Sequence, residues 1–159
     1  MKIIFLDVDG VLVHSGTVGL GKETGEAFGT SFYHAATIDQ ECLKRLLRIV
    51  EATGAKIVVS SVWRRFDGQS TALRRAFATA GVERRALREL IIGSTPHLGE
   101  KRDEEVSAWL KEHPDTTSYL VIDDGIVGKH PQLNDRPNHF EGGLLESHVE
   151  EATRILNAS

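Results

Sequence analysis

Four short apolar runs, each followed directly by polar residues, constrain the fold of this chain more than any other feature. They span residues 2–6, 56–59, 90–92 and 119–122. Uninterrupted β-branched runs of this length are typical of strands buried on both faces of a parallel sheet. Apolar residues at helical spacing lie between the runs, and they predict helices at about 39–53, 70–80, 102–111 and 148–156. This alternation predicts an α/β fold with right-handed crossovers.

Two stretches, 14–37 and 125–143, interrupt the alternation. The first is rich in glycine, threonine and serine, and the second holds two prolines and a Gly-Gly pair. Each follows the end of a predicted strand, so we expect both at the carboxyl edge of the sheet, where ligands bind in such folds. The sequence contains no internal repeat and no domain linker, and we interpret residues 1–159 as one domain.

The composition limits the classes of protein that the chain can belong to. The formal net charge is −4, so any surface that attracts a polyanion must be local. Cys42 is the only cysteine, which excludes an intrachain disulfide, and its apolar-periodic surroundings predict a buried thiol. No apolar run approaches the roughly 18 residues of a membrane span, and we expect a cytoplasmic protein without membrane contact. The histidines form no recognisable zinc spacing.

Carboxylates follow the first and the last apolar run. Asp7 and Asp9 lie two residues apart, so in an extended segment they share a face and repel each other unless a cation or a shared proton compensates. A solvated turn with two incidental aspartates is the alternative. Asp123 and Asp124 follow the last run, and the ends of parallel strands can be neighbours. Carboxylate clusters of this kind favour hard cations such as Mg2+.

Candidate phosphate-binding residues follow the second run. Ser60 and Ser61 come directly after it, and a hydroxyl beside backbone N–H groups can hold a phosphoryl oxygen. A polar strand end or a helix N-cap explains these serines equally well. Arg64 and Arg65 each offer a planar donor fork that suits phosphate, and we interpret Trp63 as a packing residue.

Two basic residues, Lys101 and Arg102, begin the helix predicted at 102–111. Positive charge in a first helical turn opposes the helix dipole. A solvated helix face accounts for one such residue, whereas a nearby phosphate or carboxylate accounts for it better. We therefore expect at least one of the two to face an anion.

The four groups together are more specific than any one of them. Their order is strand–Asp-x-Asp-Gly, strand–Ser, Lys/Arg at a helix start, and strand–Asp-Asp. In this order the chain resembles the haloacid dehalogenase-like (HAD) superfamily from residue 3 to about residue 125, and Phe-Leu-Asp-Val-Asp-Gly-Val-Leu is the most specific part. The resemblance implies a Rossmann-like three-layer sandwich with a central parallel sheet. It also implies a phosphatase that forms an aspartyl-phosphate.

The resemblance implies roles for the acidic residues. Asp7 would be the nucleophile and Asp9 the general acid/base. Asp7 and the backbone carbonyl of Asp9 would bind Mg2+. Asp123, with Asp124, would complete the metal site.

The second and third motifs each leave a choice of two residues. Ser60 fits the second motif best by strand length, with Ser61 as a close rival. Lys101 or Arg102 fills the third motif, and the superfamily more usually has lysine there. The residues that we expect to contact the substrate are Ser61, Arg64 and Gly10.

The spacing of the motifs limits the substrate. Superfamily members that act on small metabolites usually carry a cap domain, but neither interval here has room for a separate domain of roughly 50 residues. We therefore expect little or no cap and an open site for an extended phosphoester. A narrower resemblance, carried by Ser-Ser-Val-Trp-Arg and by Gly-Gly-Leu-Leu at 142–145, is to compact domains linked to nucleic-acid end repair and to uncharacterised bacterial phosphatases. The expected substrate is a nucleic-acid end or a phosphoprotein, and no partner protein is predicted.

Several alternatives stay open. The 14–37 stretch can act as a flap with Phe28, Phe32 or Tyr33 on the substrate, although such aromatics more often pin a long loop. A small-metabolite or nucleotide phosphatase, a phosphotransferase and a phosphonate-cleaving enzyme would share the nucleophile. A receiver-type signalling module is disfavoured, because its acidic pair and its acceptor lie on different strands. A non-catalytic phosphate-binding domain is disfavoured by the intact acidic set.

Overall fold

The computed structural model describes residues 1–21 and 30–158, and all of their side chains except those of residues 30–33. Its sheet is parallel, as predicted, and its strand order is β3-β2-β1-β4. The strands are β1 (Lys2–Leu6), β2 (Lys56–Val59), β3 (Ile91–Ser94) and β4 (Ser118–Ile122). The chain moves from β1 to β2 on one side and later returns to β4 on the other, so the strand order reverses at β1. Ligands bind at such switch points, outside the carboxyl ends of the strands.

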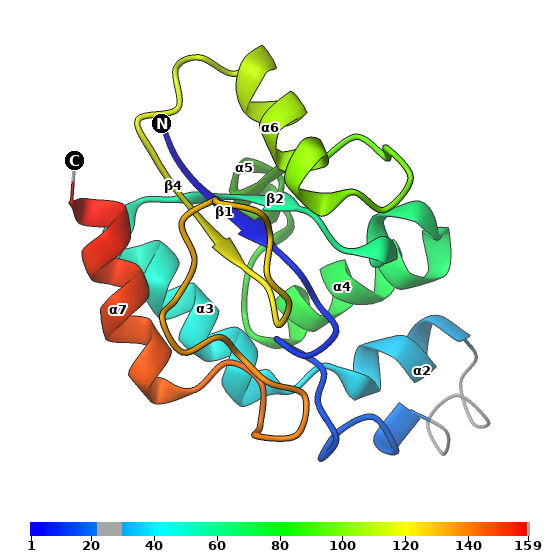
Figure 1. The fold of residues 1–159 in the computed structure, drawn as a ribbon. Coiled ribbons are helices and arrows are strands. Elements are labelled where there is room, and N and C mark those ends of the chain that lie inside the picture. Colours follow the sequence, from blue (N-terminus) through cyan, green and yellow to red (C-terminus); the bar gives the residue numbers. More distant parts are fainter. Residues whose placement is uncertain (22–29, 159) are drawn as a thin grey trace.

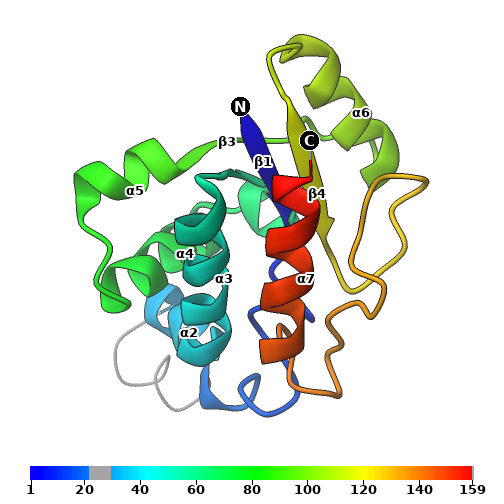
Figure 2. The same ribbon diagram turned by 90° about the vertical axis from the view of Figure 1, so that its left-hand side faces the viewer.

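Helices cover both faces of the sheet and form the outer layers of the sandwich. The helices are α2 (Thr30–Thr37), α3 (Gln40–Thr53), α4 (Asp67–Thr79), α5 (Arg84–Leu90), α6 (Arg102–Glu112) and α7 (Glu146–Asn157), with a 3-10 helix η1 (Val62–Arg65). Figures 1 and 2 show α6 on the opposite side of the strands from α3, α4 and α7. The three-layer α/β prediction is therefore confirmed.

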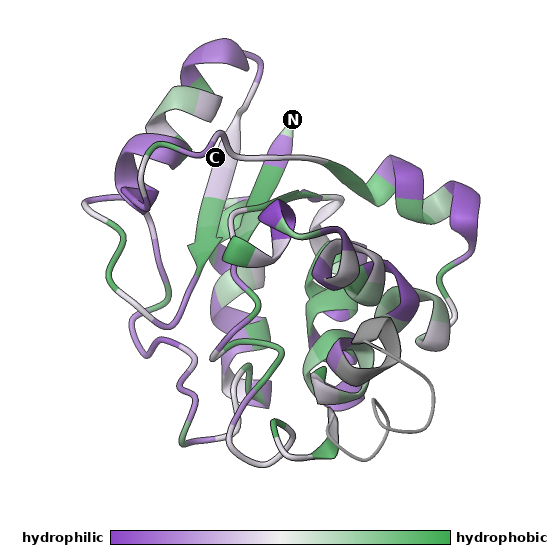
Figure 3. Ribbon diagram, turned by 90° about the vertical axis from the view of Figure 1, so that its right-hand side faces the viewer, coloured by the Kyte–Doolittle hydropathy of each residue, from purple (hydrophilic) through white to green (hydrophobic). Residues whose placement is uncertain are grey.

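The two apolar cores explain why the strands read as continuous apolar runs. On one face, Ile4 and Leu6 pack in a large core with Leu46 of α3 and residues from α4, α5 and α7. On the other face, Phe5 packs with α6, and its ring lies 5.4 Å from that of Trp109 in an edge-to-face contact. Figure 3 shows mainly hydrophobic colour on the strands, whereas the outer helices carry both hydrophilic and hydrophobic residues. Both faces of β1 are thus buried, which leaves no polar alternation in the sequence.

Some helices differ from the sequence prediction. The helix predicted at about 39–53 is present as α3; Asp39 caps it by accepting a hydrogen bond from the Glu41 N–H, and Gly54 ends it at φ 70°. In contrast, α2 lies in the stretch predicted as irregular, and α5 was not predicted. Only Leu87 and Leu90 of α5 are buried, which is too few positions to give a helical period. The α2 sequence consists largely of threonine, serine and aromatic residues with modest helix propensity, and the helix forms where it packs against α4.

The two interrupting stretches both leave carboxyl strand ends, as expected. Phe28 lies outside the described residues, as do the side chains of Phe32 and Tyr33, so the flap hypothesis stays a prediction. The later stretch packs Val127 and Leu133 into the two cores. Within residues 1–21 and 30–158, no separate cap domain interrupts the sandwich. None of the described helices has the length and apolar character that a membrane span needs.

Candidate active site

Side chains that follow the four strands form one row across the carboxyl edge of the sheet. The ladder continues one residue past each strand end, through Asp7 N–H to the Ile122 carbonyl (2.9 Å) and Ser60 N–H to the Leu6 carbonyl (2.9 Å). Thr95 N–H likewise donates to the Val59 carbonyl (3.1 Å). By strand register, Thr95, Ser60, Asp7 and Asp123 are therefore neighbours. Because side chains alternate along a strand, the row lies on the α6 face of the sheet.

Three carboxylates in this region can hold a metal ion. One oxygen each of Asp7, Asp123 and Asp124 lies within 4.8 Å of the others. Asp7 and Asp123 are buried, whereas Asp124 is exposed. A partly solvent-exposed site with only oxygen ligands suits Mg2+, which binds one or two carboxylates and keeps several water ligands. The convergence of Asp7 and Asp123 that the metal-site prediction requires is present.

Gly10 brings the two acidic loops together. Its φ of 80° lies in the left-handed region, and a Cβ at this position would collide with the Asp124 carboxyl group. Glycine is therefore required at this position of Asp-x-Asp-Gly, because only a residue without a side chain lets the Asp124 carboxyl approach the backbone of residue 10. We expected Gly10 to contact the substrate, and the geometry gives it this separate task.

Arg102 provides the positive charge in the row. Its guanidinium forms a charged hydrogen bond with Asp123 and lies 3.4 Å from Asp7 Oδ1. Lys101, the other candidate, is exposed and pairs with Glu104 on the surface of α6 (3.5 Å). The geometry therefore favours Arg102 for the third-motif role.

The electrostatics of Asp7 reflect a crowded carboxylate pair. Burial, and next the charge of Asp123, raise the pKa of Asp7 from 3.8 to about 8, although Arg102 acts in the opposite direction. Burial also raises the pKa of Asp123, and Arg102 again opposes the shift. One guanidinium thus does not compensate two buried carboxylates, and a bound cation would lower both pKa values.

Hydroxyl groups complete the row. Among the described residues, neither Ser60 Oγ nor Thr95 Oγ1 has a hydrogen-bond partner, although both are buried. Buried hydroxyls are normally paired, so these two have capacity for a ligand oxygen. Ser61 differs, because its Oγ accepts the Trp63 N–H (3.2 Å) and caps η1. Of the two serines that the sequence offered, Ser60 is the neighbour of Asp7 across the sheet.

Asp9 lies outside the carboxylate cluster and is held by Trp63. The Asp9 side chain is exposed, and its Oδ2 accepts a hydrogen bond from the indole Nε1 of Trp63 (3.1 Å). Trp63 is buried, as expected of a packing residue, but its N–H also orients Asp9. We did not predict this second role; Trp63 lies 54 positions from Asp9, and only its place in the Ser-Ser-Val-Trp-Arg pattern marked it.

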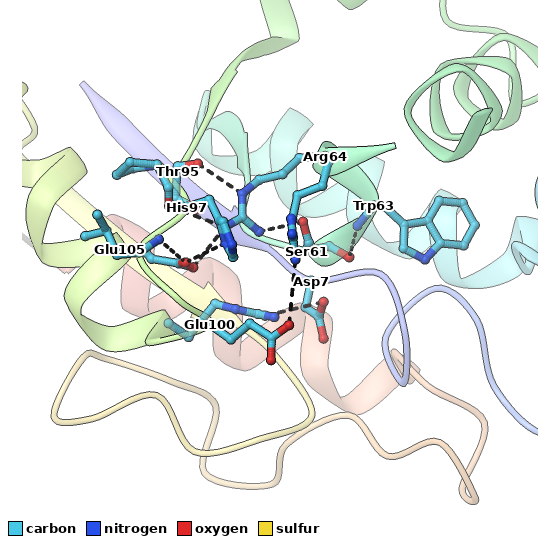
Figure 4. A network of polar contacts seen from close by, with 12 residues as sticks. Asp7, Ser61, Trp63, Arg64, Thr95, His97, Glu100 and Glu105 are labelled. Atoms are coloured by element: carbon cyan, nitrogen blue, oxygen red, sulfur yellow. Dashed lines mark hydrogen bonds and ion pairs between the residues drawn. The ribbon is translucent and has the colours of Figure 1, made fainter. Parts of the chain in front are cut away.

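Arg64 is bound by protein acceptors, which differs from the expected phosphate contact. Its guanidinium donates to the carbonyls of Thr95 (3.0 Å) and Ser61 (2.7 Å) and to Glu105 Oε2 (3.0 Å). Figure 4 shows it between η1, the segment after β3 and α6. The side chains of Arg64 and Glu105 are 7% and 1% exposed, so this is a buried ion pair. Glu105, which we did not predict, also accepts the Leu98 N–H (2.8 Å) and thereby joins the helix of Arg102 to the segment after Thr95.

A second group of possible ligands, His14, Asp39 and Cys42, is satisfied by its own contacts. His14 Nε2 lies 2.6 Å from Asp39 Oδ2, and the Cys42 thiol donates to the Gly142 carbonyl (3.3 Å). Burial raises the pKa of Cys42 to about 11, which disfavours the thiolate. The predicted burial of Cys42 is confirmed, and we interpret the group as structural.

The three-layer fold with its parallel sheet is that of the haloacid dehalogenase-like superfamily. The chain belongs to the family described as "HAD domain in Swiss Army Knife RNA repair proteins", which matches residues 3–151. Comparison with curated proteins and with solved structures gave no significant match.

Proposed function

We propose that this protein is a Mg2+-dependent phosphomonoester hydrolase that works through an aspartyl-phosphate on Asp7. The proposal rests on one observation above all: a buried carboxylate, a second carboxylate and a guanidinium converge at one sheet edge, through Asp7, Asp123 and Arg102. The unpartnered hydroxyl of Ser60 adds a donor for a phosphoryl oxygen. Such preorganised donors and charges are what phosphoryl transfer requires.

In the first step, a carboxylate oxygen of Asp7 attacks phosphorus while the bond from phosphorus to the ester oxygen breaks. Asp9 gives its proton to the departing oxygen. Arg102 neutralises charge on the phosphoryl oxygens, and the Ser60 hydroxyl donates a hydrogen bond to one of them. Asp7, Asp123 and Asp124 would hold Mg2+, which would supply further neutralisation of the charge on the phosphoryl group.

In the second step, Asp9 takes a proton from a water molecule, which attacks phosphorus. The bond between phosphorus and Asp7 breaks, inorganic phosphate leaves, and the Asp7 carboxylate is restored. Because the Asp9 side chain is exposed and lies two residues after Asp7, we assign both proton transfers to it. An acid/base residue of this kind favours hydrolysis of the aspartyl-phosphate, so that the protein does not stay phosphorylated.

We propose an RNA end as the substrate. The family description refers to RNA repair. Within the described residues no cap domain covers the row of Asp7, so a long chain can approach it. A phosphoprotein, the other substrate expected from the sequence, has no comparable support.

The test is a panel of phosphomonoesters with and without Mg2+. We expect hydrolysis of p-nitrophenyl phosphate and of RNA 3′- or 5′-phosphate ends, with the higher kcat/KM on the RNA, and loss of both activities on chelation. A phosphopeptide and a mononucleotide serve as comparison substrates. No hydrolysis of any phosphomonoester, or equal rates after chelation, contradicts the proposal.

The hydrogen bond from Trp63 to Asp9 gives a separate prediction. Replacement of Trp63 by Phe removes the donor and leaves an aromatic ring, so we expect kcat on p-nitrophenyl phosphate to fall about tenfold, as for a lost charged hydrogen bond. Phe77→Leu is the control, because that buried ring packs in the same core as Trp63 and has no hydrogen bond to Asp9. Equal losses in the two variants would assign the effect to packing alone.

A further inference from the structure

The segment 64–88 is basic in a chain that is acidic overall. It contains seven arginines, no lysine and two carboxylates, Asp67 and Glu83, whereas the whole chain has a formal net charge of −4. The segment runs from the end of η1 through α4 into α5 and stops before Glu89. It thus begins beside the active site. Positive charge is therefore concentrated on one part of the molecule, which is the condition for local attraction of a polyanion.

Three of these arginines have no compensating carboxylate among the described residues. Arg74, Arg84 and Arg88 are exposed, and none of the ion pairs in residues 1–21 and 30–158 involves them. Arg65 and Arg85, in contrast, lie near Glu100 and Glu89, at 3.7 Å and 3.5 Å. Arg74, Arg84 and Arg88 therefore carry positive charge that no ion pair among the described residues balances.

The three uncompensated arginines line one pocket between α4 and α5. Its volume is about 850 Å³, and Val82 and Leu87 contribute an apolar floor. The guanidinium groups can thus contact the charged groups of a ligand, while flat apolar groups of the same ligand lie against Val82 and Leu87.

This pocket connects to the active site through shared arginines. Arg74 also lines a pocket of about 160 Å³ below β3, together with Arg64. Arg64 in turn lines a pocket of about 260 Å³ with Arg65 and Arg102. Three pockets, each sharing an arginine with the next, thus lie between Arg102 and α5.

An exposed aromatic ring lies at the start of this path. Phe66 is 55% exposed, and the guanidinium of Arg65 lies 5.9 Å from its ring centre. Phe66 precedes α4, and Arg74 follows at a distance of about 12 Å along the helix axis. An exposed ring flanked by arginines is the arrangement on which a base stacks, because every base has a π-face.

We propose that Arg65, Phe66, Arg74, Arg84 and Arg88, here called the arginine track, bind a single-stranded nucleic-acid chain whose end lies in the active site. The proposal rests on the proposed function for the position of the chain end, and it adds the surface that binds the rest of the strand. Arginine in place of lysine favours phosphate, which the planar guanidinium contacts through two donors. The ring of Phe66 favours a nucleic acid over an acidic polypeptide, which offers no base to stack.

Binding to an unphosphorylated, fluorescently labelled oligouridylate tests the track without catalysis. We compare the full chain with the triple variant Arg74→Gln, Arg84→Gln and Arg88→Gln over a range of salt concentrations, without Mg2+. Loss of three phosphate contacts reduces the slope of log K against log salt by about two units. At low salt the triple variant is expected to bind at least about tenfold more weakly.

The matched control replaces three exposed lysines outside the track by glutamine, at Lys44, Lys111 and Lys129. It makes the same change in net charge, and we expect its affinity and slope to stay within about twofold of the wild type. If both triple variants bind oligouridylate equally weakly, net charge alone explains the loss of affinity and the proposal is overturned. Absence of oligouridylate binding by the wild type at low salt would overturn it as well.

Phe66→Ala separates a nucleic acid from other polyanions. We expect it to weaken oligouridylate binding about tenfold, as for one lost stacking contact, and to leave inorganic polyphosphate binding unchanged. Polyglutamate is the third probe, and binding as tight as that of oligouridylate would assign the track to acidic proteins and overturn the proposal.

Failure of the track and failure of the proposed function are distinguishable. If the oligonucleotide binds as described but no phosphomonoester is hydrolysed, the proposed function fails and the track stands. If RNA ends are hydrolysed but the arginine variant binds like the lysine control, the track fails and the proposed function stands.

Discussion

Replacement of Asp7 by Asn is expected to abolish phosphomonoester hydrolysis, with a loss of at least about 10⁴-fold in kcat. The amide keeps the size and the backbone contacts of Asp7 but lacks the nucleophilic carboxylate oxygen. The measurement is kcat on p-nitrophenyl phosphate with saturating Mg2+. Asp115→Asn, an exposed aspartate in the turn before β4, is the matched control and should keep full activity. Full activity of the Asp7 variant would remove Asp7 from the mechanism.

The same variant should be more stable than the wild type in the absence of metal. Burial and the charge of Asp123 raise the pKa of Asp7 from 3.8 to about 8, so ionisation of this carboxyl opposes folding. In the wild type the neutral Asp7 carboxyl favours the folded state, and this stabilisation is lost as pH rises from about 4 to about 8. The amide of the variant does not titrate, so its stability lacks this pH dependence. We expect the difference in melting temperature to grow over that window and to level off above it. A destabilised variant would mean that the carboxylate pair is better compensated than the distances indicate.

Replacement of Glu105 by Leu is expected to cost about 3–5 kcal/mol of unfolding free energy. The change leaves the buried guanidinium of Arg64 without its charge partner and also removes the acceptor for the Leu98 N–H. Breaking a buried ion pair on one side is costly because the remaining charge stays desolvated. Urea unfolding, with the free energy extrapolated to water, measures the cost.

Two further variants separate this pair from general effects on α6. Glu104→Leu changes an exposed residue one position earlier, and we expect a change within about 0.5 kcal/mol. The double variant Arg64→Met, Glu105→Leu removes both charges, so it should cost less than the sum of the single changes. An additive double variant would show that the two residues act independently.

The strands and the edge of the sheet that carries the site followed from the sequence. Both faces of β1 are buried, so its residues read as an uninterrupted apolar run that needs no knowledge of its neighbours. Parallel strands end at the same edge, and this rule alone predicted that Asp7 and Asp123 converge. The short helix α5 and the aromatic-rich α2 were missed because their formation depends on packing rather than on local propensity.

The choices between adjacent residues required the tertiary structure. Consecutive helix residues point about 100° apart, so the rotation of α6 about its axis decides that Arg102, and not Lys101, faces the sheet. That rotation is set by Val106 and Trp109, which pack against the strands. For the serines, strand length already favoured Ser60 over Ser61, and the hydrogen bond from Ser60 N–H to the Leu6 carbonyl places Ser60 next to Asp7.

The sequence by itself determined the fold class, the sheet edge and the acidic residues of the candidate site, because each depends on local pattern and on the direction of parallel strands. Only the tertiary structure decided that Trp63 holds Asp9 and that Arg64 pairs with Glu105. The partners lie 54 and 41 residues apart, and a hydrogen bond over such a separation leaves no periodic signal in the chain. It depends on how η1, α6 and the loop after β1 are packed, which is a property of the whole fold.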